Sequence, residues 1–240
     1  MTEHKSLPLF VALDLNTLRE ARQTLDMLNG LIDAVKIGPR LYAQGGSHFL
    51  KEIVDHGYKL FLDLKLHDIP NTVRLAVETL ADLGIFCLTL HSDGGRRMME
   101  ESVAARDRLG SSMKLLGITV LTSFDEQSWA EVFPGCPMTE AIKRRAWLCD
   151  DCGMDGVVCS PLDLPVVCKT TRPSLLKVVP GVRLVAGGDD QSRVATPADA
   201  FRNGADYIVM GRPIYQAPDV RKAVKEIAAS IEEGLSCAKN

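Results

Sequence analysis

The stretch FLDLKLHDIPNT, residues 61–72, sets Asp63, Lys65 and Asp68 at the end of an apolar run. Side chains of a β-strand point alternately to opposite faces, so this pattern puts Asp63, Lys65 and His67 on one face and the intervening leucines on the other. A sheet covered by helices is apolar on both faces, and buried charges lose their hydration. The stretch therefore indicates a chemical site. The alternative is a salt bridge that caps the strand beside the start of a helix.

Short apolar runs alternate with amphipathic segments along the whole chain. Eight runs predict strands: Phe10–Leu15, Ala34–Gly38, Lys59–Leu66, Phe86–His91, Leu115–Leu121, Gly156–Ser160, Leu176–Val179 and Tyr207–Gly211. Helical spacing of apolar residues fills the gaps over residues 17–29, 40–55, 72–83, 95–109 and 219–233. Alternating strands and helices favour a parallel sheet with right-handed crossovers. Eight such units predict an α/β fold of the (β/α)8 TIM-barrel type, whereas five or six would leave an open sheet.

Composition narrows the class of protein. The chain has 240 residues, of which 46% are hydrophobic and 25% charged, as in an ordinary globular protein. We expect a single barrel domain over residues 1–240. A net charge of −3 gives no basic footprint for nucleic acid, so an anionic ligand would need a local positive site.

The sequence also limits where in the cell the protein works and whether it binds a metal. We expect no secretion signal and no membrane span, because no run of about 18 uncharged apolar residues occurs. Seven cysteines, an odd number, favour a reduced cytoplasmic protein, and the pair Cys149 and Cys152 lies in a predicted helix, where we interpret both as plain thiols. The five histidines show no zinc-binding spacing, so we expect no metal site.

Charged residues gather where the predicted strands end. Active sites of such barrels lie at the carboxyl ends of the strands. Lys36 stands inside an otherwise apolar strand and needs acidic partners, which Asp14 and Asp63 on the flanking strands can supply. Thr122 follows the fifth strand. The polar residues of the first, second, third and fifth strands thus predict one mouth at the carboxyl ends of the strands.

A second cluster is typical of a phosphate site. Gly211 and Arg212 end the eighth strand, where such barrels bind phosphate groups through backbone N–H groups and bidentate arginine. Arg183 and Gln191 lie in the irregular stretch 180–197 after the seventh strand, whose GGDD at residues 187–190 suits a flexible lid. A second irregular stretch, 124–137, predicts a long loop.

The chain resembles the orotidine 5′-phosphate decarboxylase family in motifs that span nearly its whole length. They are Phe10–Asp14, Lys36, Asp63–Thr72, Val120–Ser123, Pro180–Arg183, Asp190-Gln191 and Gly211-Arg212. Many relatives have proline after the arginine of the strand-seven loop, where this chain has Leu184.

The resemblance implies decarboxylation of orotidine 5′-phosphate to UMP without metal or cofactor. Lys65 would protonate C6 of the pyrimidine, Asp63 would face the departing carboxylate, and Lys36 and Asp14 would hold the ribose. The resemblance also implies a homodimer in which Asp68 and Thr72 reach the partner's site, and it places Ile69 among the substrate-binding residues. Thr122 would contact the base, and the phosphate would be held by Arg183, Gln191, Gly211 and Arg212.

Two other functions fit part of the pattern. A metal-dependent sugar-phosphate decarboxylase or aldolase of the same barrel group would share the Asp63–Asp68 motif, but Lys36 would repel Mg²⁺. A noncatalytic phosphosugar-binding module would need Gly211 and Arg212 but not a lysine between carboxylates. We interpret His67 and His91 as structural hydrogen-bonding residues near the mouth.

Overall fold

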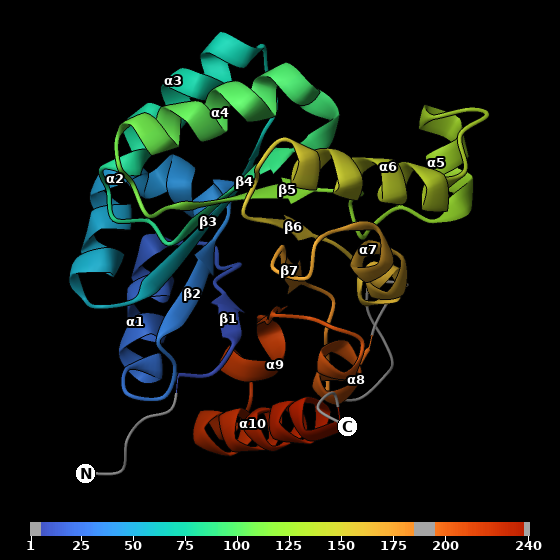
Figure 1. Ribbon diagram of the computed structural model, residues 1–240. Helices are drawn as coiled ribbons and strands as arrows, with labels where there is room; N and C mark the ends of the chain where they lie inside the picture. The colour runs from blue at the N-terminus through green and yellow to red at the C-terminus, as the bar shows by residue number, and fades with distance from the viewer. Residues whose placement is uncertain (1–5, 185–194, 238–240) are drawn as a thin grey trace.

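The computed structural model describes residues 6–184 and 195–237, and its strands close into one barrel (Figure 1). All eight neighbouring pairs are parallel and follow chain order, which confirms the predicted (β/α)8 architecture. The strands are β1 Leu9–Ala12, β2 Ala34–Ile37, β3 Lys59–Leu66, β4 Cys87–His91, β5 Lys114–Ile118, β6 Gly156–Val158, β7 Leu176–Val179 and β8 Tyr207–Met210. Several end earlier than predicted, because the apolar runs continue into the loops that form the mouth.

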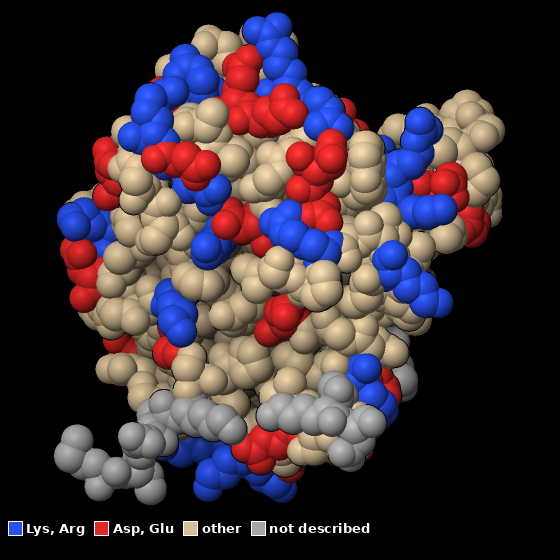
Figure 2. Space-filling model, viewed as in Figure 1, with Lys and Arg blue, Asp and Glu red and all other residues tan. Residues whose placement is uncertain are grey.

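Helices surround the barrel, as Figure 1 shows. They are α1 Leu18–Leu28, α2 Pro39–Asp55, α3 Pro70–Ala81, α4 Arg96–Arg108, α5 Glu126–Val132, α6 Met138–Asp151, α7 Leu164–Thr170, α8 Pro197–Arg202, α9 Arg212–Tyr215 and α10 Val220–Cys237, with short 3₁₀ turns at Ser92–Gly94 and Pro161–Asp163. Within the described ranges, no helix is long and apolar enough to cross a membrane. Positive and negative side chains are interspersed over the face drawn in Figure 2.

Helix α5 corrects the prediction of a long loop over residues 124–137. Asp125 accepts a hydrogen bond from the backbone N–H of Ser128, and the Ser128 hydroxyl lies 3.1 Å from the Asp125 backbone nitrogen, which donates to it. This capping box satisfies two backbone donors at the start of the helix. Trp129 anchors the short helix, stacked on Phe133 at 4.1 Å between ring centroids. The glycine and prolines that follow this capping box favour a loop, so the sequence alone did not indicate the short helix before them.

Two apolar layers hold the barrel. The larger lies between the strands and the helices, and the smaller fills the barrel interior with residues that include Phe10, Phe61, Leu116 and Val178. The rings of Phe10 and Phe61 meet edge to face at 5.3 Å. Because these apolar side chains fill the barrel interior, the polar site lies at the carboxyl ends of the strands.

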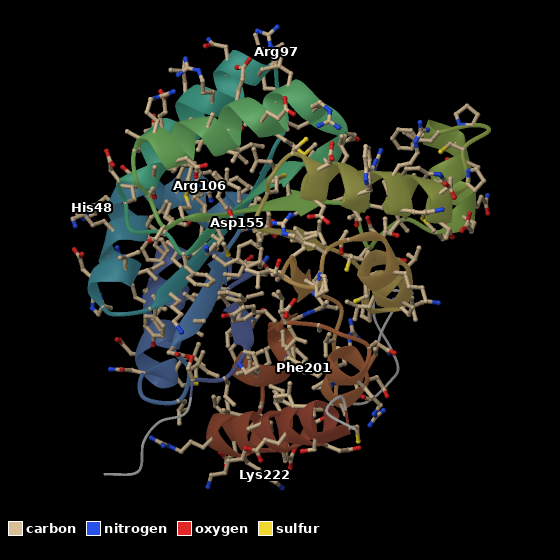
Figure 3. The ribbon with its side chains drawn as sticks, in the orientation of Figure 1. His48, Arg97, Arg106, Asp155, Phe201 and Lys222 are labelled. Atoms are coloured by element: carbon tan, nitrogen blue, oxygen red, sulfur yellow. The ribbon has the colours of Figure 1, made fainter. Side chains whose placement is uncertain are left out.

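A largely buried ion pair lies at the end of the barrel where the strands begin, opposite the mouth. Arg106 of α4 and Asp155, just before β6, point toward one another (Figure 3) and form an ion pair. Asp155 also accepts a hydrogen bond of 2.9 Å from the backbone N–H of Leu115. This pair therefore ties α4 to the amino ends of β5 and β6, away from the mouth.

Strand β3 departs from regular alternation beyond Asp63. Its register against β4 shifts between Leu62 and Leu66, and Lys65 has a φ of 52°. Strict alternation therefore fails beyond Asp63: the Lys65 amine still meets the Asp63 carboxylate as predicted, but His67 is exposed and does not join them. An irregularity of this kind re-aims side chains, which a strict two-residue period does not anticipate.

Candidate active site

Four charged side chains form a row of alternating sign at the mouth. The Lys36 Nζ donates to Asp14 Oδ1 at 3.3 Å and to Asp63 Oδ2 at 3.5 Å, and the Lys65 Nζ donates to the same Asp63 oxygen at 2.8 Å. The side chains of Lys36 and Asp63 are only 13% and 11% exposed. The structure thus brings together Asp14, Lys36, Asp63 and Lys65, as the sequence predicted, with each buried charge beside an opposite one.

Asp63 is held in its ionised form. Burial raises the pKa of this carboxyl group, but the Lys36 and Lys65 ammonium groups, with hydrogen bonds from Lys65 and Thr89, outweigh burial and lower the pKa below its ordinary value. At neutral pH the group is therefore a carboxylate. A buried anion is placed directly against the amine of Lys65.

A cavity of about 370 Å³ joins this row to the loops after β7 and β8. Its wall consists of Ala12, Asp14, Lys36, Phe61, Asp63, Val158, Pro180–Arg183, Val209–Pro213 and Gln216. Asp14, Lys36 and Asp63 of the charged row thus line the same cavity as the predicted phosphate residues Arg183, Gly211 and Arg212. A Cβ on Gly211 would lie 3.0 Å from the backbone oxygen of Ala12, so glycine lets the two chains approach closely here.

Residues on the two sides of the undescribed stretch 185–194 lie side by side. The backbone N–H of Arg183 donates to the oxygen of Ala195 at 3.0 Å, and Val182 pairs with Ala195 in a parallel bridge. This contact places Arg183 at the cavity. The predicted phosphate residue Gln191 and the lid sequence 187–190 lie outside the described residues.

Other predicted site residues do not line this cavity. Asp68, Ile69 and Thr72 lie exposed at the start of α3, where Asp68 Oδ1 accepts the N–H of Ile69 at 2.6 Å, and half-buried Thr122 lies beyond β5. Lys65 reaches the cavity wall through its contact with Asp63. Within the one chain described, no ion pair joins Asp68 to Lys65.

His67 and His91 lie together, apart from the residues that line the cavity. The rings of His67 and His91 lie 5.4 Å apart, and neither lines the cavity. The His91 Nδ1, 3.2 Å from Asp93 Oδ1, and the Arg145 guanidinium lower the pKa of Asp93 to about 2 despite burial. Their structural role stays a prediction. In the described ranges, no three His, Cys, Asp or Glu side chains gather so as to hold a metal ion.

Two residues of the site were missed in the sequence. Gln216, which follows α9, lines the cavity. Thr89 of β4 is fully buried and donates to Asp63 Oδ1 at 2.9 Å. The sequence feature that could have indicated Thr89 is its hydroxyl inside the apolar run 86–90. A buried threonine that bonds only to backbone gives the same sequence pattern, so this feature does not identify a site residue.

Comparisons with known proteins agree with this geometry. Residues 7–227 match the family described as orotidine 5′-phosphate decarboxylase / HUMPS. The chain is 41% identical over 229 residues to orotidine 5′-phosphate decarboxylase of Pseudomonas putida, covering 93% of this chain and 97% of that protein. It is 42% identical over 226 residues to the protein of the same name from Opitutus terrae, covering 93% and 98%. The crystal structure of the Lactobacillus acidophilus orotidine 5′-phosphate decarboxylase superposes with a TM-score of 0.82 at 34% identity, covering 93% of this chain and 98% of that one.

Proposed function

The chain belongs to the orotidine 5′-phosphate decarboxylase / HUMPS family, and on that premise we propose that it converts orotidine 5′-phosphate to UMP, the last step of de novo pyrimidine synthesis. The observation that carries the proposal is the alternating row from Asp14 to Lys65 beside a cavity that ends at Arg212. One end suits a carboxylate-bearing ring, and the other suits a phosphate.

The row supplies what the reaction demands. When carbon dioxide leaves C6, the bonding electron pair stays on that carbon, where no adjacent carbonyl can accept it. A fixed cation and a proton source must stabilise this charge. The Lys65 ammonium provides both: its Nζ transfers a proton to C6 to give UMP and neutral carbon dioxide, and the neutral amine regains a proton from water.

Asp63 has two tasks in this proposal. Its carboxylate lies 2.8 Å from the Lys65 Nζ and so pairs with the amine and fixes its position. It also faces the substrate carboxylate, and the repulsion between the two anions is relieved as carbon dioxide departs. Lys36 and Asp14 would hold the ribose hydroxyls and brace the row.

The phosphate end contributes binding energy far from the reacting carbon. Arg183, Gln191, Gly211 and Arg212 would hold the phosphate, and Thr122 would contact the base. Such remote binding energy can offset the crowding of two carboxylates at the reacting end. Arg212 therefore matters for catalysis although it does not touch C6.

Arg212→Ala tests the phosphate end. We expect kcat/KM to fall by about 10²- to 10⁴-fold, because a bidentate arginine makes two charge-assisted hydrogen bonds, each worth roughly 1.5–3 kcal/mol, and about 1.4 kcal/mol is tenfold. Steady-state kinetics by ultraviolet absorbance measures the change. Arg221→Ala, an exposed arginine of α10, is the matched control and should behave as the unaltered chain does. An unchanged kcat/KM in Arg212→Ala would remove this residue from the site.

The function itself is tested by incubating the chain with orotidine 5′-phosphate in the presence and absence of EDTA. We expect the same loss of substrate absorbance in both, because Lys36 puts a cation where a metal-dependent relative would need Mg²⁺. Activity that disappears with EDTA and returns with Mg²⁺ would instead support the sugar-phosphate enzyme. A folded sample that binds UMP without consuming substrate would support the noncatalytic module.

We further propose that the chain works as a single domain over residues 1–240 and forms a homodimer whose sites are shared. Ile69 is 66% exposed and Leu75 of α3 is 47% exposed, so the surface around Asp68 and Thr72 presents apolar side chains suited to a partner. All seven cysteines are free thiols, which supports work in the reducing cytoplasm.

A further inference from the structure

Thr89 occupies an unusual place in β4. It is fully buried, and its hydroxyl makes two hydrogen bonds to the strand that carries the charged row. Its Oγ1 donates to Asp63 Oδ1 at 2.9 Å and accepts the backbone N–H of Lys65 at 2.9 Å. One hydroxyl thus contacts both the carboxylate and the backbone of the residue that bears the amine.

The backbone at Lys65 needs such support. In the described ranges, Lys65 is the one residue other than glycine with a positive φ, at 52°. A residue with a Cβ is disfavoured in this conformation and persists there only where its surroundings hold it. The register of β3 against β4 shifts between Leu62 and Leu66, so regular ladder bonding is interrupted around Lys65. The Thr89 hydroxyl supplies an acceptor for the Lys65 N–H at that interruption.

The two carboxylate oxygens of Asp63 have different partners. Oδ1 accepts from Thr89, whereas Oδ2 accepts from Lys65 at 2.8 Å and from Lys36 at 3.5 Å. The hydrogen bond from Thr89 therefore fixes the orientation of the carboxylate, with Oδ2 directed toward the two ammonium groups.

We propose that Thr89 is a positioning residue for the decarboxylation. It holds the positive-φ backbone conformation of Lys65 and the orientation of Asp63, so that the amine is directed at C6. The inference rests on the proposed function and deepens it. It assigns to β4 a part in the site that Asp14 after β1 and the charged residues of β2 and β3 do not perform.

Thr89→Val keeps the shape of the side chain and removes the hydroxyl, whereas Thr89→Ser keeps the hydroxyl. We expect Thr89→Val to lower kcat by about 10- to 100-fold with KM for orotidine 5′-phosphate within about threefold, because misaimed groups weaken the chemical step more than binding. Thr89→Ser should stay within about threefold of the unaltered chain. Thr171→Val removes another buried hydroxyl, which donates to the backbone oxygen of Val167 at 3.0 Å, and should leave both constants unchanged.

The pH profile supplies a readout that a purely structural role would not move. Asp63 faces Lys36 from β2, Lys65 from β3 and the neutral, buried Cys87 thiol from β4, with Asp14 beyond Lys36. All of these groups remain in Thr89→Val, while the carboxylate loses one donor. The pKa of Asp63 should therefore rise, and the acid limb of kcat/KM should move to higher pH in the valine variant but not in the serine variant.

Three outcomes would overturn the proposal: full kcat in folded Thr89→Val, equal losses in the valine and serine variants, or an acid limb that does not move. If Thr89→Val does not fold, as judged by its melting temperature, Thr89→Ala is compared with Thr89→Ser by the same criteria. An unaltered chain without decarboxylase activity would refute the proposed function, whereas an active chain indifferent to Thr89→Val would refute this inference alone.

Discussion

Lys65→Ala should show no measurable decarboxylation, a loss of at least about 10⁴-fold, while UMP still binds within about tenfold of the unaltered affinity. The variant lacks both the cation beside the developing C6 charge and the proton that quenches it, and each of these effects is worth several orders of magnitude. The phosphate end of the cavity is unchanged, so nucleotide binding persists. Absorbance assays at high enzyme concentration and calorimetric titration with UMP measure the two quantities.

Two further variants make this result specific. Lys65→Arg keeps the positive charge but cannot release a proton near neutral pH, and it should also be almost inactive. Lys169→Ala removes an exposed lysine of α7 and should change nothing. Substantial turnover by Lys65→Ala or Lys65→Arg would contradict the assignment of the proton donor.

Mixing two inactive variants should restore activity if the sites are shared. Lys65→Ala and Asp68→Ala should each be nearly inactive alone, but their equimolar mixture should recover about a quarter of the unaltered activity. About half of randomly exchanged dimers are mixed, and in a two-fold dimer each mixed pair has one intact site of two. The exposed position of Asp68, apart from Lys65 in its own chain, motivates this arrangement.

The mixing experiment needs proof that subunits exchange. Different affinity tags on the two variants allow the mixed dimer to be isolated and assayed. A mixture of two differently tagged Lys65→Ala preparations is the control and should stay inactive. An isolated mixed dimer without activity would show that Asp68 serves the site of its own chain.

The fold could be predicted from the sequence because local patterns decide it. Each strand is a short apolar run followed by a helix with apolar spacing, and the number of such units distinguishes a closed barrel from an open sheet. The partners of Lys36 could also be inferred, since a lysine within an apolar strand requires carboxylates on its neighbours, and Asp14 and Asp63 meet it in the structure.

The finer geometry could not be predicted because it depends on contacts between strands. The bend at Lys65 arises from the register shift against β4, and a two-residue alternation conceals it. Thr89 has the same local sequence signal as a threonine bonded only to backbone, so its contact with Asp63 appears only in three dimensions. The residues of the site that would serve a partner cannot be distinguished by sequence from those that serve their own chain.

The most direct test of the central claim, that Lys65 exchanges a proton with C6, follows UMP alone in D₂O by NMR. A group that protonates C6 in the forward direction must also remove that proton in reverse. We predict that the unaltered chain replaces hydrogen at C6 of bound UMP with deuterium, whereas Lys65→Ala saturated with UMP does not. Equal exchange rates in the two proteins would contradict the account.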